Sequence, residues 1–473
     1  MIQLRVLGDE GVKQVHTATR RILSEVGITL THPAAREMLA GHGARIAENR
    51  VYLPADLVDQ CVAQCPRTVK VQGRDPAKAV ILGDGGCYAH NVGGTPNILD
   101  TVSSERRAAV RQDNVNTARL LDALPNISSI TPFFTPQDVP AAGMSLWMYY
   151  DTLANTTKPV HGPGVQTPRE VRAVAEMARI AAPDGTVTIA ISPLSPLGFP
   201  NDVVEAIIET ARLGLPLGPL PCPILGATAP MSIAGGLAQQ NAEVLTSIVL
   251  AQLTHAGLPI FYCGRLSAMS LRTGLSVWGN PEIGLIGVGT VELGHSYHLP
   301  VNVYGLCTDA HNSDIQSGYE RMLNALLPTL AGADEISGVG EVWGGVVSSL
   351  AQMVVDDEIL DYIKRARRGF EANEESLAVE VILKAMNGAR NFLGQKHTVK
   401  FMRQGEVLQP RLAKREGWSE WESAGRPGVV ERAAERAAEL IATHQVPPLS
   451  EQQLAAMQEV IRGVEQGPKG AVE

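Results

Sequence analysis

Short apolar runs alternate with longer stretches of helical spacing over most of the chain after about residue 80. The apolar runs are rich in β-branched residues, which is typical of buried strands, and the stretches between them carry apolar residues three and four apart, as amphipathic helices do. Repeated strand–helix alternation implies parallel strands joined by crossover helices. The seven strands expected on this basis are ISSITPFF (127–134), KPVHGPG (158–164), TVTIAISP (186–193), LPLGPLPCPI (215–224), LPIFYCG (258–264), LPVNVYGL (299–306) and DEISGVGE (334–341).

An eighth strand is expected near 79–92 or 284–291. Eight parallel strands with crossover helices predict an α/β fold of the (β/α)8 TIM barrel type. A doubly wound sheet is less favoured, because no G-x-G-x-x-G motif opens a helix after an early strand.

The pattern divides the chain into four parts. Residues 1–75 are expected to form an N-terminal helical segment, in which ARIAENRVYLPADLVDQCV (44–62) predicts a strand, a Pro and a helix. Residues 76–375 are expected to form the catalytic barrel. Residues 376–465 are expected to be a C-terminal helical appendage, followed by a tail at 466–473.

The composition is that of a folded protein with an acidic surface. The 473 residues are 45% hydrophobic and 19% charged, which provides for a large buried core. The formal net charge is −9 without any block of Lys or Arg, which argues against nucleic acid or an anionic membrane as a partner. The N-terminus lacks the apolar core of a signal peptide, and no stretch reaches 18 uncharged apolar residues. We therefore expect a soluble, cytoplasmic protein.

Six cysteines are too sparse for a disulfide scaffold. The closest pair, Cys61 and Cys65, lies one helical turn apart, which suits a buried helix face as well as a metal site. No C-x-x-C motif and no nearby Cys or His completes four ligands, and the pair His295 and His298 has no third ligand close by in sequence. We therefore expect no tightly bound metal in this chain.

In a barrel of this type the chemistry lies on the loops that follow the C-terminal ends of the strands. Six such loops are rich in Gly, Pro, Ser and Asn. Any one of these loops can be explained as a simple turn. Six of them at the same end of a barrel indicate an enzyme, but they do not identify its substrate. The loops are GPGVQ (162–166), SPLSPLGFPN (192–201), ILGATAPMS (224–232), GRLSAMS (264–270), GLCTDAHNSD (305–314) and GVGEVWGG (338–345).

The segment GATAPMSIAGGLAQQNAEVLTSIVLAQL (226–253) resembles the signature of the trimethylamine methyltransferase family, the corrinoid-dependent methylamine methyltransferases. The resemblance covers nearly the whole chain and implies a (β/α)8 barrel with helical additions, the fold that the strand count predicts. It extends in family order over NVGGTPNILD (91–100), LPIFYCG (258–264), CTDAHNSDIQSGYE (307–320) and RPGVVERAAERAAELIATHQVPPLS (426–450).

The resemblance also implies an activity. The founding members of the family transfer a methyl group from trimethylamine to the cobalt of a separate corrinoid protein and carry pyrrolysine in the active site. Only standard residues occur here, so the chain resembles the non-pyrrolysine branch, which acts on quaternary amines such as glycine betaine. This implies a methyltransferase that moves a methyl group from glycine betaine or a related betaine to Co(I) of a cognate corrinoid protein. Two alternatives stay open: a different methylated amine as the donor, or a non-catalytic module that binds quaternary amines or the corrinoid protein.

The corrinoid, a cobalamin, is expected on a partner protein. The motif D-x-H-x-x-G, which holds a corrinoid through its histidine, is absent: Asp309-Ala310-His311 begins like it, but Asp314 stands where the Gly should be. The expected partners are therefore a corrinoid protein and a small quaternary amine. An apolar barrel of this type is also expected to form a homo-oligomer.

A quaternary ammonium group is held by aromatic faces, each contributing roughly 0.5–2 kcal/mol. Aromatic residues are only 4% of the chain, so their positions matter. Each candidate can equally fill the core. The aromatic residues expected to bind substrate, which end predicted strands or lie in the 338–345 loop, are Phe133, Phe134, Tyr262, Tyr304 and Trp343.

The carboxylate of a betaine needs partners as well, and Arg265 and His311 are the side-chain candidates. Alignment with the family places His311 near the pyrrolysine position, so we expect it to be catalytic, against the alternative of an exposed, idle side chain. Its neighbours Asp309 and Asp314 favour the imidazolium form if either contacts it.

Three further polar residues are site candidates. Glu243 lies in an otherwise apolar helix, and a buried carboxylate requires a partner, either a structural hydrogen bond or the substrate. Gln316, in SDIQSGYE, is the third catalytic candidate beside Glu243 and His311. Asn91, in HNVGGTPN, is a substrate-binding candidate.

Overall fold

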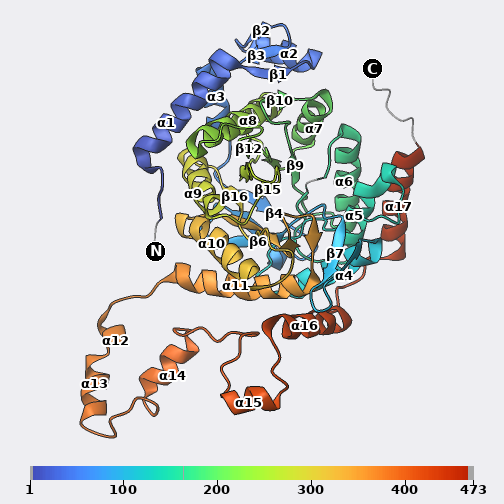
Figure 1. The fold of residues 1–473 in the computed structure, drawn as a ribbon. Coiled ribbons are helices and arrows are strands. Elements are labelled where there is room, and N and C mark those ends of the chain that lie inside the picture. The colour runs from blue at the N-terminus through green and yellow to red at the C-terminus, as the bar shows by residue number, and fades with distance from the viewer. Residues whose placement is uncertain (1–3, 163, 467–473) are drawn as a thin grey trace.

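Parallel strands lie at the centre of the molecule, with helices around them (Figure 1). In this computed structural model, residues 4–162 and 164–466 are described. All seven expected strand regions contain paired residues, and the eighth strand is β6 (Tyr88–Asn91). The other central strands are β9 (Ile189–Ile191), β11 (Leu217–Pro219), β13 (Tyr262–Gly264), β16 (Val301–Tyr304) and β17 (Glu335–Val339), and two further segments pair through Ile130 and Val160.

The pairings among these segments are parallel. β13, β16, β17 and β6 form one sheet in that order, and β9 pairs with β11 in another. Three of the remaining links are single parallel bridges: Ile260 to Leu217, Val187 to Val160, and Val160 to Ile130. The last link is a backbone hydrogen bond of 2.8 Å from Ser128 N–H to the Ala89 carbonyl. The fold class is therefore α/β, as the alternation predicts.

The alternative position of the eighth strand, 284–291, is wrong. These residues lie inside α9 (Pro281–Ser296), which is buried along most of its length. A short apolar run does not distinguish a buried strand from a buried helix. Here glycine allows close helix packing, since a Cβ at Gly287 would lie 3.1 Å from Pro328 of α10 (Ile315–Ala331).

The expected crossover helices surround the strands. Their apolar faces point inward, and α6 starts with a capping box between Thr167 and Glu170, which explains where it begins. No described helix is long and apolar enough to cross a membrane. Besides α9 and α10 these helices are α4 (Arg111–Ala123), α5 (Met144–Ala154), α6 (Pro168–Ala181), α7 (Asn201–Arg212), α8 (Ile233–Thr254) and α11 (Leu350–Arg368).

The N-terminal segment contains a small sheet as well as helices. β10 (Gly198–Phe199), from a loop of the central region, pairs with β1 and so joins the two parts. The hairpin of β4 (Val69–Val71) and β5 (Val80–Leu82) crosses the boundary expected after residue 75, because its strands pair with each other. The other elements are α1 (Gly8–Arg21), a π-helical turn (Ile22–Val26), β1 (Ile28–Leu30), α2 (Pro33–Gly41), β2 (Arg45–Ala47), β3 (Arg50–Tyr52) and α3 (Ala55–Ala63).

Short strands follow the C-terminal ends of the central strands. They form two additional sheets in the loops, one of them in the order β18-β19-β7-β8 and the other in the order β12-β14-β15. Their bounds are β7 (Asn97–Asp100), β8 (Glu105–Ala108), β12 (Ile224–Leu225), β14 (Ser267–Met269), β15 (Ser276–Val277), β18 (Glu341–Val342) and β19 (Val347–Ser348).

The C-terminal appendage consists of two different parts. α16 (Val429–Thr443) packs on α11 and α4, and α17 (Glu451–Gln466) packs on α6 and α5. The four preceding helices extend away from this body (Figure 1). Of the expected tail, residues 467–473 lie outside the described residues. The extending helices are α12 (Glu374–Leu377), α13 (Val379–Met386), α14 (Lys396–Arg403) and α15 (Trp418–Ser423).

A buried ion pair joins α10 and α11 to the loops that follow β16 and β17. Arg321 and Asp356 are both fully buried, with 3.1 Å between Nη1 and Oδ2. Arg321 also donates to the Leu306 carbonyl, and Asp356 accepts from the Gly340 amide. Removal of one partner would leave the other charge uncompensated in the interior.

We expect Asp356→Ala to lower the free energy of unfolding by about 3–5 kcal/mol, because the Arg321 guanidinium would stay buried without its counter-ion. Urea denaturation followed by circular dichroism measures this change. The matched control is Glu439→Ala, which removes the partner of the exposed Arg436 and should cost less than about 1 kcal/mol. Equal losses in the two variants would contradict the prediction.

Candidate active site

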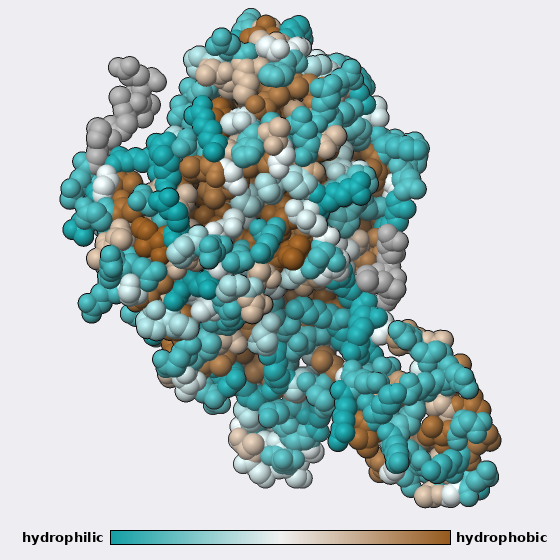
Figure 2. Space-filling view, turned by 180° about the vertical axis from the view of Figure 1, so that it is seen from behind, coloured by the Kyte–Doolittle hydropathy of each residue, from teal (hydrophilic) through white to brown (hydrophobic). Residues whose placement is uncertain are grey.

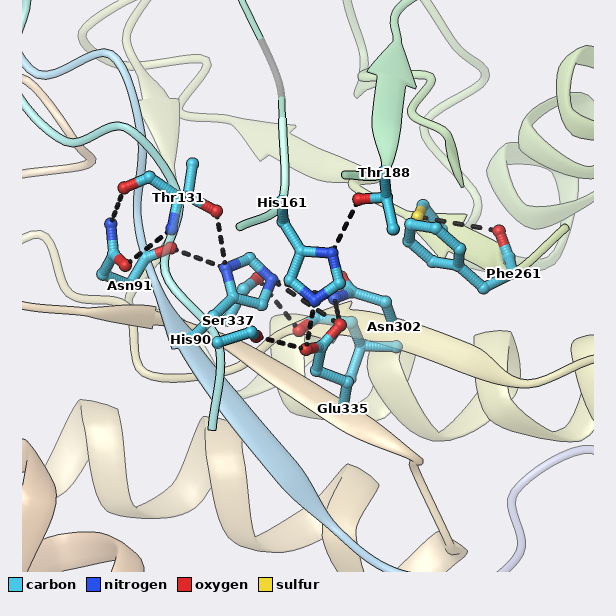
Figure 3. Close-up of polar contacts among 12 residues, drawn as sticks. His90, Asn91, Thr131, His161, Thr188, Phe261, Asn302, Glu335 and Ser337 are labelled. Atoms are coloured by element: carbon cyan, nitrogen blue, oxygen red, sulfur yellow. Dashed lines mark hydrogen bonds and ion pairs between the residues drawn. The ribbon is translucent and has the colours of Figure 1, made fainter. Parts of the chain in front are cut away.

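A carboxylate lies buried among the central strands, at Glu335 of β17 (Figure 3). His161 Nε2 lies 3.0 Å from Glu335 Oε1, and Asn302 Nδ2 donates to Oε2 at 2.6 Å. Ser129 Oγ donates to Oε1 at 2.9 Å. His90 Nε2 in turn lies 2.9 Å from Asn302 Nδ2. Five different strand segments therefore contribute to this network.

The network determines the charge of its members. Burial alone would raise the pKa of Glu335, but the imidazoles of His161 and His90 and the hydrogen bond from Asn302 hold that pKa well below its usual range. Burial lowers the pKa of His90 to about 4, so this imidazole is neutral. A neutral His90 can donate from Nδ1 to the Asn91 carbonyl and accept from Asn302 at Nε2.

Arg265 connects this interior network to the C-terminal edge of the strands. It follows β13, and its Nη2 donates to the side-chain oxygen of Asn302. Its guanidinium carbon lies 5.6 Å from the centre of the Tyr304 ring. The charge of Arg265 is thus held beside an aromatic face at the end of β16.

Tyr304 and Glu341 form the centre of the C-terminal edge. The Tyr304 hydroxyl donates to Glu341 Oε2, and the Thr308 amide donates to Oε1 at 2.9 Å. Glu341 is fully buried. Burial raises its pKa to about 7, although the charge of Arg321 and the hydrogen bond from Tyr304 act in the opposite direction. Glu341 is therefore a carboxyl that titrates near neutral pH.

Trp278 lies beside this pair, and Trp343 lies on the loop that contains Glu341. The Trp278 ring packs edge-on against Tyr304, with 4.9 Å between the centroids. Trp343 stacks with the exposed His311 at 5.1 Å and an angle of 30°. Gly344 has a φ of +61°, and a Cβ there would lie 3.1 Å from Trp278, so this glycine lets the loop after β17 approach the tryptophan closely.

A hollow of about 460 Å³ lies elsewhere among the loops at the C-terminal ends of the strands. Its lining includes Gly93, Gly94 and Gly164, which leave the backbone accessible. Thr135, Gln166 and other polar residues provide donors and acceptors around it.

Two of the three catalytic candidates belong to the same group of loops. His311 lies against Trp343, as described. Gln316 donates to Glu320 at 2.8 Å, and Glu320 accepts from the Thr308 hydroxyl and the Asp309 amide. Gln316 thus supports the loop after β16 through Glu320.

Glu243, the third catalytic candidate, lies in α8 and binds another loop. It accepts from Ser195 Oγ at 2.7 Å and from the Leu197 amide at 2.9 Å, and burial raises its pKa. These contacts match the structural alternative considered for this residue. A catalytic role of Glu243 stays a prediction.

Four substrate-binding candidates are not brought to the edge formed by Tyr304, Arg265 and Trp343. The buried Asn91 side chain bonds to the backbone of Thr131. Phe133 packs edge-on against Phe134, and both rings are buried. The Tyr262 hydroxyl donates to Asn241 of α8, on the outer side of β13. A role in binding substrate stays a prediction for these four residues.

Several residues of this site were not among the site candidates. Glu335 and Asn302 lie within predicted strands, where a charged or amide side chain in an apolar run is itself a signal for a polar interior. Glu341 stands alone among the glycines of GVGEVWGG, and only its burial gives it an unusual pKa. Trp278 precedes α9 and carried no signal in the sequence. Among residues 4–162 and 164–466, no group of three or more His, Cys, Asp or Glu side chains could hold a metal ion.

The fold and the site define an α/β protein whose candidate chemistry lies at the C-terminal ends of parallel strands. The family model described as trimethylamine methyltransferase (MTTB) matches residues 1–467, so the chain belongs to the trimethylamine methyltransferase family.

Three relatives of this chain are named as methyltransferases. The trimethylamine methyltransferase MttB of Desulfitobacterium hafniense (strain DSM 10664 / DCB-2) is 32% identical over 466 residues, covering 97% of this chain and 93% of that protein. MttB of Methanosarcina barkeri (strain Fusaro / DSM 804) is 30% identical over 487 residues, with 99% and 97% covered. A glycine betaine methyltransferase of Desulfitobacterium hafniense (strain Y51) is 29% identical over 475 residues, with 98% of each covered.

A solved structure also resembles this one. The monomethylamine methyltransferase MtmB of Methanosarcina barkeri matches with a TM-score of 0.52 at 16% identity, over 92% of this chain and 88% of that one. At this identity the likeness concerns the fold.

We expect Glu341→Gln to remove a pH dependence of stability. Folded Glu341 keeps its proton up to about pH 7, whereas an unperturbed glutamate loses it near pH 4.5. The folded state thus holds the additional proton between these values, and its stability falls as the pH rises through this window. The stability of E341Q relative to the wild type should increase by about 1–3 kcal/mol between pH 5 and pH 8.

Urea denaturation at pH 5, 6, 7 and 8 measures this double difference, in which any pH-independent cost of the amide cancels. Glu371→Gln, in an exposed position, is the control and should show no such trend. A flat difference between E341Q and the wild type would contradict a raised pKa at Glu341.

Proposed function

We propose that this chain transfers a methyl group from a quaternary amine, glycine betaine or a related betaine, to Co(I) of a corrinoid carried by a separate partner protein. The observation that carries the proposal is the placement of Arg265 beside Tyr304, whose ring packs in turn against Trp278. A betaine carries a quaternary ammonium group and a carboxylate. Aromatic faces bind the first and a guanidinium binds the second, so a single edge offers both kinds of contact.

The likeness to named methyltransferases supports the methyl-transfer part of the proposal. The glycine betaine methyltransferase among the relatives supports a betaine as donor, and the family resemblance supports a corrinoid protein as acceptor. The pairing order supports the finer fold as well: the links lead from β6 through every central strand segment and return through β17 to β6, as a closed (β/α)8 barrel requires.

The chemistry of a quaternary amine suits these residues. Its nitrogen has no lone pair and carries a full positive charge, so the methyl carbon is electrophilic and the tertiary amine leaves as a neutral molecule. No general acid is required for the leaving group. The Co(I) acceptor supplies the nucleophile, and the residues of this chain bind the amine, orient one methyl group and exclude water.

The site must not bind the cation too strongly. Positive charge leaves the substrate nitrogen as the methyl group departs, so a strong anion beside it would stabilise the ground state more than the transition state. A carboxyl with a pKa near 7 behind Tyr304 fits this requirement better than a permanently ionised carboxylate in contact with the substrate.

A second donor class deserves a test, because the relatives with the higher identities are trimethylamine methyltransferases. Trimethylamine has no carboxylate for Arg265 to bind. A protein acting on it would use the aromatic faces alone.

A donor panel tests the proposed function. The purified chain is mixed with Co(I) cobalamin or a corrinoid protein under reducing conditions and with glycine betaine, other betaines, choline or trimethylamine. We expect loss of the Co(I) absorption and formation of methylcobalamin with a betaine, together with the matching tertiary amine. Transfer from trimethylamine alone would favour the second donor class. Betaine binding by calorimetry without any transfer would favour a binding module and overturn the proposal.

A variant tests the proposed role of Arg265. Arg265→Gln removes a charged hydrogen bond to the carboxylate, which contributes roughly 1.5–3 kcal/mol, so KM for a betaine should rise by about 10- to 150-fold. KM for choline, which has no carboxylate, should change little. Arg272→Gln, on an exposed arginine of the following loop, is the matched control and should leave both values unchanged. Equal changes for betaine and choline in R265Q would contradict a carboxylate contact.

A further inference from the structure

An apolar surface lies uncovered on residues 370–407, which include α12, α13 and α14 and are named the arm here. Figure 2 shows brown side chains gathered on the lobe that projects from the body at lower right. Eleven large apolar side chains of the arm are exposed: Phe370, Leu377, Val379, Ile382, Leu383, Met386, Phe392, Leu393, Val399, Met402 and Val407.

The helices of the arm are too short to be stable alone. α12 has 4 residues, and α13 and α14 have 8 each. Isolated helices of fewer than about 12 residues are marginal in water. Ala385 is the one buried residue in these three helices. In α13, Val379, Ile382, Leu383 and Met386 form one apolar stripe, which is the pattern of a helix face that packs on another surface.

The arm is attached to its own body at the base. Arg365 of α11 donates to the Glu406 carbonyl at 2.7 Å, and Arg368 donates to the Gln404 carbonyl at 3.2 Å. The stripe on α13 does not take part in these bonds. The fold of a single chain therefore leaves the stripe open to solvent.

A second uncovered stripe lies on the body, on the outer face of α10. Ile315, Tyr319 and Leu323 are 87%, 61% and 39% exposed and are spaced four residues apart, so they share one face of the helix. Leu285 of the adjacent α9 is 40% exposed. Both stripes are exposed apolar helix faces, and each could be covered by packing against the other.

We propose that a second copy of this chain covers both surfaces, in a two-fold dimer in which the arm of each copy packs on the α10 stripe of the other. Two-fold symmetry gives each copy one arm contact and one stripe contact, which closes the assembly.

Area and charge favour a second copy as the occupant. At roughly 100 Å² for each large apolar side chain, eleven of them present on the order of 1,000 Å², comparable to the ~800 Å² that each partner buries in a stable interface. The arm carries five acidic and five basic residues, whereas the whole chain has a net charge of −9. A neutral arm can approach another acidic copy without net repulsion.

The apolar faces of the arm helices also need a partner that stays bound. A corrinoid protein that visits to accept a methyl group would leave the arm exposed after each turnover. A permanent partner avoids this exposure, and a second copy is present whenever the chain is made.

Sedimentation velocity on the full-length chain tests the proposal. We expect a dimer for the wild type, and for Ile382→Glu in the arm and Tyr319→Glu on α10 a dissociation constant at least tenfold higher. Val102→Glu, at an exposed apolar residue on the β7–β8 turn, is the matched control and should stay dimeric. Circular dichroism of each variant verifies that it is folded.

A mixing experiment separates a specific contact from general destabilisation. In an equal mixture of I382E and Y319E, the intact arm of Y319E can pack on the intact α10 stripe of I382E. Heterodimers should therefore form at concentrations at which each variant alone is mostly dissociated. A monomeric wild type would overturn the proposal. A dimer that neither substitution weakens would also overturn it. If Y319E stays dimeric and loses only methyl transfer, the proposal fails too, because α10 would then face the corrinoid protein. The mass readout does not depend on methyl transfer, so failure of the proposed function would leave this result unaffected.

Discussion

The buried carboxylate of Glu335 is the constraint on which the centre of the structure depends. A charge without access to water must be satisfied by neighbouring groups, and here those groups come from separate strand segments: His161, Asn302 and Ser129. The strands must therefore keep one register relative to each other. Because Asn302 also accepts from Arg265, the same network fixes a guanidinium at the C-terminal edge.

At that edge, aromatic and ionisable groups act together. Tyr304 contacts Trp278, bonds to Glu341 and lies beside Arg265, so one ring joins a second aromatic ring to both ionisable side chains. The loops that supply these residues are held by further buried contacts, among them Arg321 with Asp356. This rigidity suits the proposed reaction, in which the protein contributes mainly the orientation of a methyl group.

The alternation of strands and helices predicted the α/β class and the seven strand regions, because hydrophobic periodicity is a local property of the chain. It did not decide between 79–92 and 284–291 for the eighth strand, since an apolar run with glycines packs equally well as the helix α9. The pattern also predicted a helical C-terminal part, but not that α16 and α17 pack on the body while the arm extends away.

The sequence by itself determined the family and the fold class, and it offered Arg265, Tyr304 and Trp343 as site candidates. Only the tertiary structure decided which side of a strand each residue faces. Tyr262 begins β13, and its hydroxyl bonds to α8 on the outside. Its neighbours Phe261 and Cys263 pack together in another cluster, because successive side chains along an extended chain point in opposite directions. The roles of Glu335 and Glu341 likewise arise from burial among residues distant in sequence, and no local pattern carries that information.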